Sequence, residues 1–510
     1  MDSLVKLGQR FVVGFPGLFP DEKTLSIIKE MKIGNIILFK SNVESKEQLE
    51  KLTAFLDKFI YENTSLHPFI MIDQEGGMVS RLSNDYAIIP GAMALASNDN
   101  TDDIEECGYI TATELRNSGV NFNIAPVVDI NTAREKSILG VRSYGESADD
   151  VIKYSTAMLH GLKRGGVFSC CKHFPGHGDV AVDSHVGLPV CYKTEEEIFQ
   201  TELKPYINAI SLSCPAIMTT HILFRKIDPS NYPATMSEKI IRGILRDKLN
   251  FDGLVVTDCL EMGAIKDHYT TEEGARKALL SGIDIACISH TIETALASMK
   301  RVMEDENWQE NQDESFNRIK RIKDEYFSKL NSYTDSIDIE QSKKEINRIG
   351  EKTITKYRVK SPLSFGSDTI FIAPHPFVVT AIMNPEDKDV SFASTMAKAF
   401  SSSGLDIPVD PDKEEIVKIV EEAKNYKKIV VGTYNALSKR GQIDLVKEIA
   451  KLNRELTVVA LRNPYDLEEV PEKANAIAIY EYSVQSMAWF IKSIKENLPS
   501  SARVPFSLRK

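Results

Sequence analysis

The strongest constraint on the fold is an alternation of strand-like and helix-like segments that fills the first 290 residues. Eight short apolar runs are separated by stretches with the spacing of amphipathic helices. The runs are residues 11–15, 35–39, 69–73, 122–129, 167–173, 216–221, 253–258 and 284–289. Near-continuous apolar strands that alternate with helices are typical of parallel sheet, so eight units predict a (β/α)8 barrel of the TIM type.

A second domain is expected because 510 residues exceed what one hydrophobic core usually supports. We assign residues 1–300 to the barrel, which would carry the catalytic site, and the strongly charged residues 301–362 to a helical linker. Short apolar runs return at 369–373, 428–432, 457–461 and 476–480. Residues 363–510 are therefore predicted to form a smaller αβα sandwich.

Charge and cysteine content limit the partners and the compartment. The net charge of -11, with no long basic run, argues against nucleic-acid and anionic-membrane partners. The seven cysteines are odd in number and stand mostly inside apolar runs, as expected for reduced thiols. The sequence shows no export signal and no apolar stretch of about 18 residues. We predict a cytoplasmic location, and the sequence does not indicate an oligomeric state.

One stretch, residues 170–189, concentrates chemically active side chains and reads C-C-K-H-F-P-G-H-G-D-V-A-V-D-S-H-V-G-L-P. It opens as an apolar strand, and its glycines and prolines then predict a loop. Functional groups often lie on loops that rigid strands position. Lys172 and His173 end the strand, whereas Asp183 and His185 lie beyond the glycine run.

Ionisable residues stand at or just past most of the predicted strand ends, where barrels of this type carry their active sites. They are Asp73, Asp129, Lys172, His173, His221 and Asp258. For Asp129, a helix-capping role and a role in the site are equally consistent with the sequence. His221 fits either a core histidine bonded to a backbone carbonyl or a residue that lines the pocket floor.

These residue types suit the cleavage of a glycosidic bond. A retaining hydrolase needs a carboxylate that attacks the anomeric carbon and a second group that protonates the leaving oxygen. Asp258 fits the first role, and we expect neighbouring cations such as Arg142 or Lys172 to lower its pKa. A histidine titrates near neutrality, so His185 suits the second role, with Asp183 orienting its ring.

Five segments resemble glycoside hydrolase family 3, in particular its β-N-acetylglucosaminidases of the NagZ type. They read D-Q-E-G-G (73–77), V-S-R-L (79–82), G-V-R-S-Y-G (140–145), K-H-F-P-G-H-G-D with D-S-H (172–179 and 183–185) and V-V-T-D-C-L-E-M (255–262). They follow the order of the family and span residues 10 to 290, far more than a lone short motif. Met78 stands where the family usually has arginine, and Tyr144 replaces the usual phenylalanine.

The resemblance implies a retaining exo-β-N-acetylglucosaminidase that needs no cofactor. It implies that Asp258 is the nucleophile and that His185 with Asp183 is the acid/base dyad. It also implies that the hydroxyls of the terminal sugar are bound by Asp73, Arg81, Arg142, Lys172 and His173. The expected substrates carry terminal GlcNAc, either cell-wall fragments from peptidoglycan recycling or chitooligosaccharides. Preference for GlcNAc over glucose follows from the resemblance alone.

Other activities stay open. A histidine acid/base repels an attacking phosphate less than a carboxylate does, so phosphorolysis to GlcNAc 1-phosphate is the closest alternative. A metal-dependent hydrolase is a minor alternative, with candidate ligands His173, His177, Asp179, Asp183 and His185. Pro175 and Gly176 prevent the helix that a zinc-binding H-E-x-x-H pair needs. A non-catalytic carbohydrate-binding protein would not need both Asp258 and the D-S-H loop, and Glu75 is interpreted as a structural carboxylate.

Overall fold

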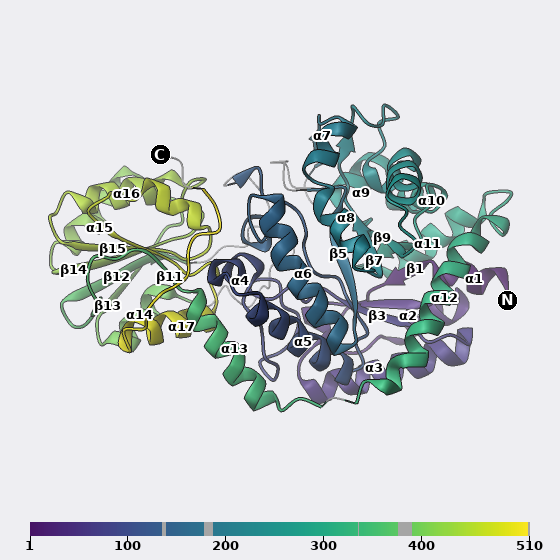
Figure 1. Ribbon diagram of the computed structural model, residues 1–510, viewed down its shortest axis with the longest axis horizontal. Helices are drawn as coiled ribbons and strands as arrows, with labels where there is room; N and C mark the ends of the chain where they lie inside the picture. The colour runs from purple at the N-terminus through teal and green to yellow at the C-terminus, as the bar shows by residue number, and fades with distance from the viewer. Residues whose placement is uncertain (135–138, 178–186, 335, 376–389, 508–510) are drawn as a thin grey trace.

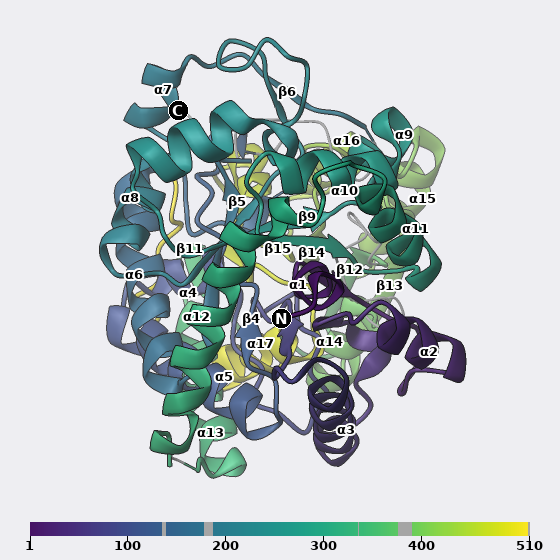
Figure 2. The same cartoon turned by 90° about the vertical axis from the view of Figure 1, so that its right-hand side faces the viewer.

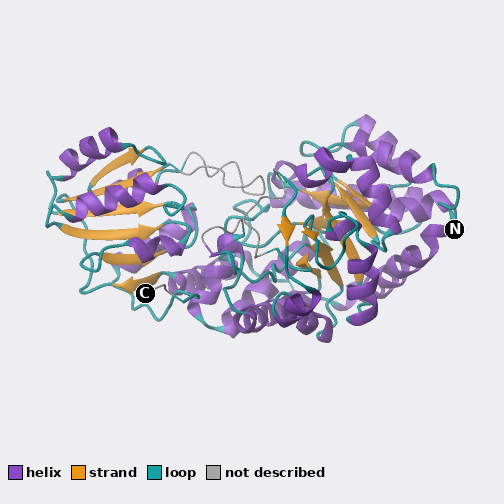
Figure 3. Cartoon of the chain, turned by 90° about the horizontal axis from the view of Figure 1, so that it is seen from above, coloured by secondary structure: helices purple, strands orange, loops and turns teal. Residues whose placement is uncertain are grey.

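The chain forms two parts that lie side by side along the long axis of the molecule (Figure 1; Figure 3 shows the same arrangement from above). The computed structural model describes residues 1–134, 139–177, 187–334, 336–375 and 390–507. The N-terminal part contains a closed barrel, and the C-terminal part contains a separate sheet covered by helices on both faces. The predicted fold class is thereby confirmed.

The barrel closes in the strand order β1-β10-β9-β7-β5-β4-β3-β2, and every neighbouring pair is parallel. Its strands are β1 (Phe11–Val13), β2 (Asn35–Leu38), β3 (Phe69–Ile72), β4 (Phe122–Asn123), β5 (Phe168–Phe174), β7 (Ala216–Thr219), β9 (Leu254–Cys259) and β10 (Ile285–Ile288). Each lies within one of the eight predicted runs, except that Phe174 extends β5 and Cys259 extends β9 by one residue each. Two short strands, β6 (Val190–Cys191) and β8 (Leu223–Phe224), pair outside the barrel.

Helices follow most of the strands because the intervening sequence has an apolar stripe and clear capping residues. In α3 (Lys46–Thr64), Leu49, Leu52, Leu56 and Ile60 are buried at helical spacing, and Ser45 accepts a hydrogen bond from the Gln48 amide at the start. The other main covering helices are α2 (Glu22–Glu30), α5 (Thr101–Asn117), α6 (Ala148–Gly165), α8 (Lys204–Ser211), the π-helix η5 (Lys239–Lys248), α10 (Thr271–Leu280) and α11 (Ile292–Met303).

Helix α12 (Asp313–Lys329) closes the end of the barrel at which the strands begin (Figure 2). Its Tyr326 ring lies 4.5 Å from the ring of Phe168, measured between centroids, inside the aromatic layer that Phe69 and Phe122 complete. The ammonium group of Lys323 donates to Gln9 Oε1 over 2.7 Å. Because this end is plugged, the opposite end, where the strands finish, is the face on which a ligand can enter.

The second sheet has six strands in the order β11-β16-β15-β14-β12-β13. They are β11 (Thr355–Arg358), β12 (Thr369–Pro374), β13 (Ser403–Ile407), β14 (Lys428–Thr433), β15 (Glu455–Ala460) and β16 (Asn475–Ala478), and β11 alone among them is antiparallel to its neighbour. Helices α14 (Phe392–Phe400) and α17 (Val484–Lys495) lie on one side, and α15 (Lys413–Ala423) and α16 (Arg440–Ala450) lie on the other (Figure 1). Within the predicted linker, α12 and α13 (Ile339–Thr353) are helical, whereas β11 is a strand that the sequence did not indicate.

The segments that follow β15 and β16 contact the loops that follow β3 and β4 of the barrel. Asn131 donates to the Tyr465 hydroxyl over 3.0 Å, and Arg134 forms an ion pair of 2.5 Å with Glu468. Gln485 donates to the carbonyl of Ile88 over 3.0 Å. The second domain therefore lies against one side of the open end of the barrel.

Candidate active site

Six of the predicted site residues lie at the open end of the barrel. Asp73 directly follows β3, Lys172 and His173 belong to the last half of β5, and Asp258 is the penultimate residue of β9. Arg142 ends a short 3-10 helix, η3 (Gly140–Arg142), in the loop after β4, and Arg81 lies in the loop after β3. The structure thus gathers residues that are up to 185 positions apart in the sequence, counted from Asp73 to Asp258.

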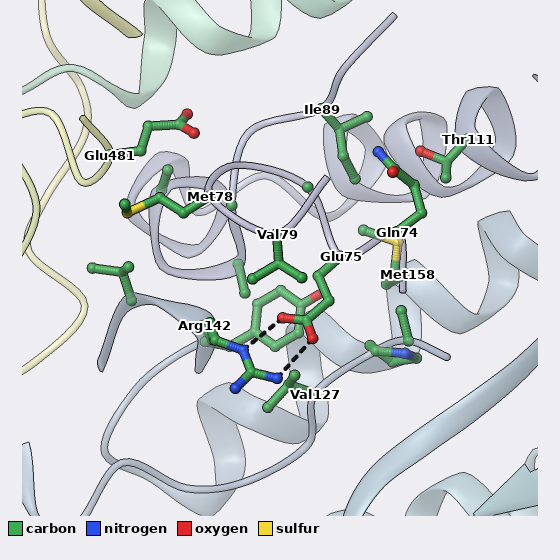
Figure 4. Close-up of a pocket in the computed structure, with 18 of the residues that line it drawn as sticks. Gln74, Glu75, Met78, Val79, Ile89, Thr111, Val127, Arg142, Met158 and Glu481 are labelled. Atoms are coloured by element: carbon green, nitrogen blue, oxygen red, sulfur yellow. Dashed lines mark hydrogen bonds and ion pairs between the residues drawn. The ribbon is translucent and has the colours of Figure 1, made fainter. Parts of the chain in front are cut away.

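A buried network of ion pairs connects three of these loops and strands. The Lys172 ammonium group lies 2.7 Å from Asp73 Oδ1 and 2.6 Å from Glu75 Oε1. Arg142 binds Glu75 with two nearly parallel hydrogen bonds of 2.8 and 2.7 Å, from Nε and Nη2 (Figure 4). A bidentate pair of this kind fixes the guanidinium plane as well as its position.

The charges in this network keep its members ionised. Burial alone raises the pKa of Glu75, but the Arg142 and Lys172 charges outweigh it and hold the pKa far below the ordinary value. Burial lowers the pKa of Lys172, and Asp73 and Glu75 reverse that effect and raise it. Glu75 therefore has the structural contacts that the sequence interpretation expected, holding two cations at the barrel opening.

Both cations keep donors beyond those that the carboxylates use. An ammonium group has three donors and a guanidinium has five. The carboxylates Asp73 and Glu75 use two donors of Lys172, and Glu75 uses Nε and Nη2 of Arg142. The remaining donors have the chemistry needed to bind sugar hydroxyls.

Asp129 supports the histidine segment rather than capping a helix. Its Oδ2 lies 2.7 Å from His173 Nδ1 and also accepts from the His173 amide, and its Oδ1 accepts from the His177 amide over 2.7 Å. Burial raises the pKa of Asp129, but the charge of His173 and the hydrogen bonds lower it below its usual value. An ionised Asp129 directs Nδ1–H of His173 toward itself and leaves Nε2 of that ring for a ligand.

His177 packs behind this pair. Its ring centroid lies 5.7 Å from that of His173. Burial, followed by the nearby His173 charge, lowers the pKa of His177 to about 4. His177 is therefore neutral at physiological pH and helps to position the loop.

Asp258 is partly exposed at the end of β9, and its backbone is firmly held. The amide of Cys259 donates to Asp258 Oδ1 over 2.7 Å, while the Cys259 carbonyl lies 2.9 Å from Nε2 of His221. His221 is fully buried, which agrees with a core histidine bonded to a backbone carbonyl. The predicted lowering of the Asp258 pKa by Arg142 or Lys172 stays a prediction, and the described acidic partners of these two cations are Asp73 and Glu75.

Arg81 is buried beside the same carboxylates. Burial lowers its pKa, and the charges of Asp73 and Glu75 act in the opposite direction. Its guanidinium carbon lies 5.9 Å from the centroid of the Phe39 ring. Arg81 is thus in the right region for the sugar-binding role that the resemblance implies.

The predicted acid/base dyad, Asp183 and His185, lies outside the residues that the structure describes. Asp179, one of the metal ligands considered, also lies outside them. Across the described ranges, no group of three or more His, Cys, Asp or Glu side chains could hold a metal ion. None of the described helices is both long enough and apolar enough to cross a membrane.

The second domain also reaches this region. Glu481, which follows β16, points toward the loop of Gly77 and Met78 (Figure 4). A Cβ atom on Gly77 would lie 2.9 Å from Glu481 Oε2 and 2.8 Å from Gly91, and Gly77 has a φ of +53°. Met78 is buried in the apolar cluster of the second domain, so its side chain joins the two parts.

The cavity between these loops is too small for a sugar. It is lined by residues of the loop after β3, by Arg142 and by Glu481 (Figure 4), and its volume is about 30 Å³. A cavity of this size holds about one water molecule. Glu75 and Arg142, which form the ion pair, are both part of its lining.

Comparisons with known proteins agree with this architecture. Residues 5–323 match the family described as the glycosyl hydrolase family 3 N terminal domain. The chain is 36% identical over 291 residues to β-hexosaminidase A of Pseudoalteromonas piscicida, a match that covers 54% of this chain and 48% of that protein. It is 30% identical over 284 residues to a β-hexosaminidase of Pseudomonas aeruginosa strain PAO1, which covers 54% of this chain and 82% of the relative.

A solved structure matches over the full length. The family 3 β-N-acetylglucosaminidase from Paenibacillus sp. strain FPU-7 superimposes with a TM-score of 0.89 at 32% identity, covering 100% of this chain and 99% of that one. Both parts of the molecule therefore have counterparts in a single known enzyme.

Proposed function

The chain belongs to glycosyl hydrolase family 3, and from that premise we propose that it is a retaining exo-β-N-acetylglucosaminidase. The proposed substrates are cell-wall fragments of peptidoglycan recycling or chitooligosaccharides that end in GlcNAc. The names of the relatives support hexosaminidase chemistry. The seven free cysteines support the proposed cytoplasmic location.

The position of Asp258 carries the proposal. This carboxylate is partly exposed at the end of β9, at the same open end of the barrel as Asp73, Lys172 and Arg142. In a retaining hydrolase the exposed carboxylate attacks the anomeric carbon and forms a covalent glycosyl ester. We assign that step to Asp258.

His185 would complete the reaction. It would protonate the leaving oxygen and then accept a proton from the water that resolves the ester, with Asp183 orienting the ring. Asp73, Arg81, Arg142, Lys172 and His173 would bind the hydroxyls of the terminal sugar. Lys172 and Arg142 support this role because Glu75 orients them and, within the described residues, takes only some of their hydrogen-bond donors.

The experiment is a paired assay of aryl β-GlcNAc and aryl β-glucoside, each with and without inorganic phosphate. We expect faster release from the GlcNAc substrate, with GlcNAc as the product in both buffers. Formation of GlcNAc 1-phosphate in phosphate buffer would favour the phosphorylase alternative. Equal rates on both glycosides would contradict the proposed sugar preference.

The proposed covalent bond between the sugar and Asp258 can be tested separately by trapping it. A slow mechanism-based inhibitor, such as an activated 2-fluoro sugar, should leave one sugar bound to the peptide that contains Asp258, detected by mass spectrometry. An adduct on any other residue would contradict the assignment. His185→Ala should keep more activity on substrates with good leaving groups, because these need little protonation.

A further inference from the structure

Arg462 of the second domain lies against the barrel loop that carries Arg142. It stands two residues after the end of β15, and only 5% of its surface is exposed. Its Nη2 and Nη1 are the described atoms nearest to a Cβ atom built on Gly140, at 3.7 and 3.9 Å. Gly140 begins the 3-10 helix η3, which Arg142 ends. The second domain therefore brings a further guanidinium to the loop after β4, beside the proposed sugar site.

The Arg462 guanidinium reaches few acceptors of the protein. Its Nη1 donates to Oδ1 of Asn435, itself buried, over 3.0 Å, and this bond orients the guanidinium. Its Nε is buried and has no hydrogen-bond partner among the described residues. A guanidinium carries five N–H donors. Within the described part of the chain, most donors of Arg462 are therefore not used by the protein.

The charge of Arg462 also lacks compensation. Burial lowers the pKa of Arg462, and the nearby Arg142 charge lowers it further than the Asp466 charge raises it. Asp466 accepts a hydrogen bond from the Leu437 amide over 3.2 Å and forms no ion pair with Arg462 in the described chain. Arginine nevertheless stays protonated near neutral pH. Because a buried charge is costly without an opposite charge, an oxyanion from a ligand would stabilise this one.

A second buried arginine between the two domains provides an internal comparison. Arg134 forms ion pairs of 2.7 Å with Glu146 of the barrel and 2.5 Å with Glu468 of the second domain. Its guanidinium carbon also lies 4.7 Å from the centroid of the Tyr465 ring. Arg134 is thus neutralised by acids from both domains and connects them. Arg462, only three residues before Tyr465, has no such acid among the described residues.

We propose that Arg462 forms an oxyanion-binding subsite beside the sugar site, and that its ligand is a carboxylate on the leaving group of the substrate or free phosphate. A guanidinium binds both groups through two parallel N–H···O bonds, which fix orientation as well as position. The subsite would select substrates by a charge that the terminal sugar does not carry. The inference rests on the proposed function, because it takes Arg142 to mark the edge of the sugar site.

The test compares an aryl β-GlcNAc whose ring carries a carboxylate with its carboxamide counterpart, using the full-length protein. The ratio of the two kcat/KM values cancels effects that are common to both substrates. We expect Arg462→Gln to lower this ratio at least about tenfold, and Arg462→Lys to lower it less, because lysine keeps the charge without the planar donors. Arg454→Gln changes an exposed arginine at the other end of β15 and should keep the wild-type ratio.

A second measurement supplies inorganic phosphate and follows thermal unfolding. Phosphate should raise the melting temperature of the wild type more than chloride does at equal ionic strength, and Arg462→Gln should lose this difference. A changed carboxylate ratio without a phosphate effect assigns the subsite to the leaving group, and the reverse assigns it to free phosphate.

The proposal is overturned if neither quantity differs between the wild type and Arg462→Gln. If Arg462→Gln does not fold, Arg462→Lys serves for both comparisons. If the wild type hydrolyses neither glycoside, the proposed function fails, and the phosphate effect on unfolding then decides the subsite by itself.

Discussion

The two ends of the barrel both bury ion pairs, but they use their charges differently. At the closed end, Asp284 binds Arg246 and Arg318 over 2.7 Å each, and Arg318 belongs to α12. At the open end, Glu75 binds Arg142 and Lys172 over similar distances. The comparison shows that a buried ion pair alone does not mark an active site.

The two ends differ in how many N–H donors of their buried cations are left after the hydrogen bonds within the described protein are counted. At the closed end, Arg10 uses Nε and both terminal nitrogens on four backbone carbonyls and on Gln312. At the open end, only some of the N–H donors of Lys172 and Arg142 bind the carboxylates of Asp73 and Glu75. A saturated network stabilises the fold, whereas an unsaturated one beside a partly exposed carboxylate can bind a ligand.

The largest effect is expected at the open end, from Asp258→Asn. Removing the attacking carboxylate should lower kcat on aryl β-GlcNAc by about 10⁴-fold or more, with little change in melting temperature. Kinetics and thermal unfolding of the same preparation measure both quantities. Near-normal turnover would exclude Asp258 as the nucleophile.

The matching change at the closed end is Asp284→Asn. It removes the buried carboxylate that pairs with the partly buried Arg246 and Arg318, and should lower the free energy of unfolding by about 3 kcal/mol. Urea titration measures this loss. The kcat/KM of the folded protein should be unchanged, and a loss of kcat/KM without a loss of stability would show that the two ends are coupled.

Glu75→Gln should combine both effects. It removes the charge that holds Lys172 and Arg142, so we expect a loss of about 3 kcal/mol in stability and about 100-fold in kcat/KM. Urea titration and steady-state kinetics separate the two quantities. A change in stability alone would place Glu75 in the same class as Asp284.

The smallest effect concerns pH and His177. Its pKa falls from 6.5 in the unfolded chain to about 4 in the fold, so its contribution to stability is complete above pH 6.5 and is lost as the pH falls toward 4. The loss should reach about 2 to 3 kcal/mol. In His177→Gln, the stability measured by urea titration should vary less over this window, and in His160→Gln, a change of an exposed residue on α6, it should vary as in the wild type. Equal pH dependence in all three proteins would contradict this assignment.

The pattern of apolar residues along the sequence was sufficient to predict the strands of the barrel. Each strand is a short apolar run, and the positions of Asp73, Lys172, His173 and Asp258 at strand ends follow from where those runs stop. Helices α12 and α13 lie in the predicted helical linker, whereas strands β11 and β13 were missed, because neither forms a short apolar run of the kind that marks the other strands. Their packing depends on surfaces contributed by other parts of the chain.

The sequence by itself determined the strands of the barrel, four of the six strands of the second sheet and the set of residues at the strand ends, because an apolar run is a pattern of neighbouring residues. Only the tertiary structure decided that Glu75 joins Lys172 to Arg142, that Asp129 holds both His173 and His177, and that Glu481 approaches Gly77. These contacts join residues 44 to 404 positions apart. Such distances are set by strand register and domain packing, which no local pattern encodes.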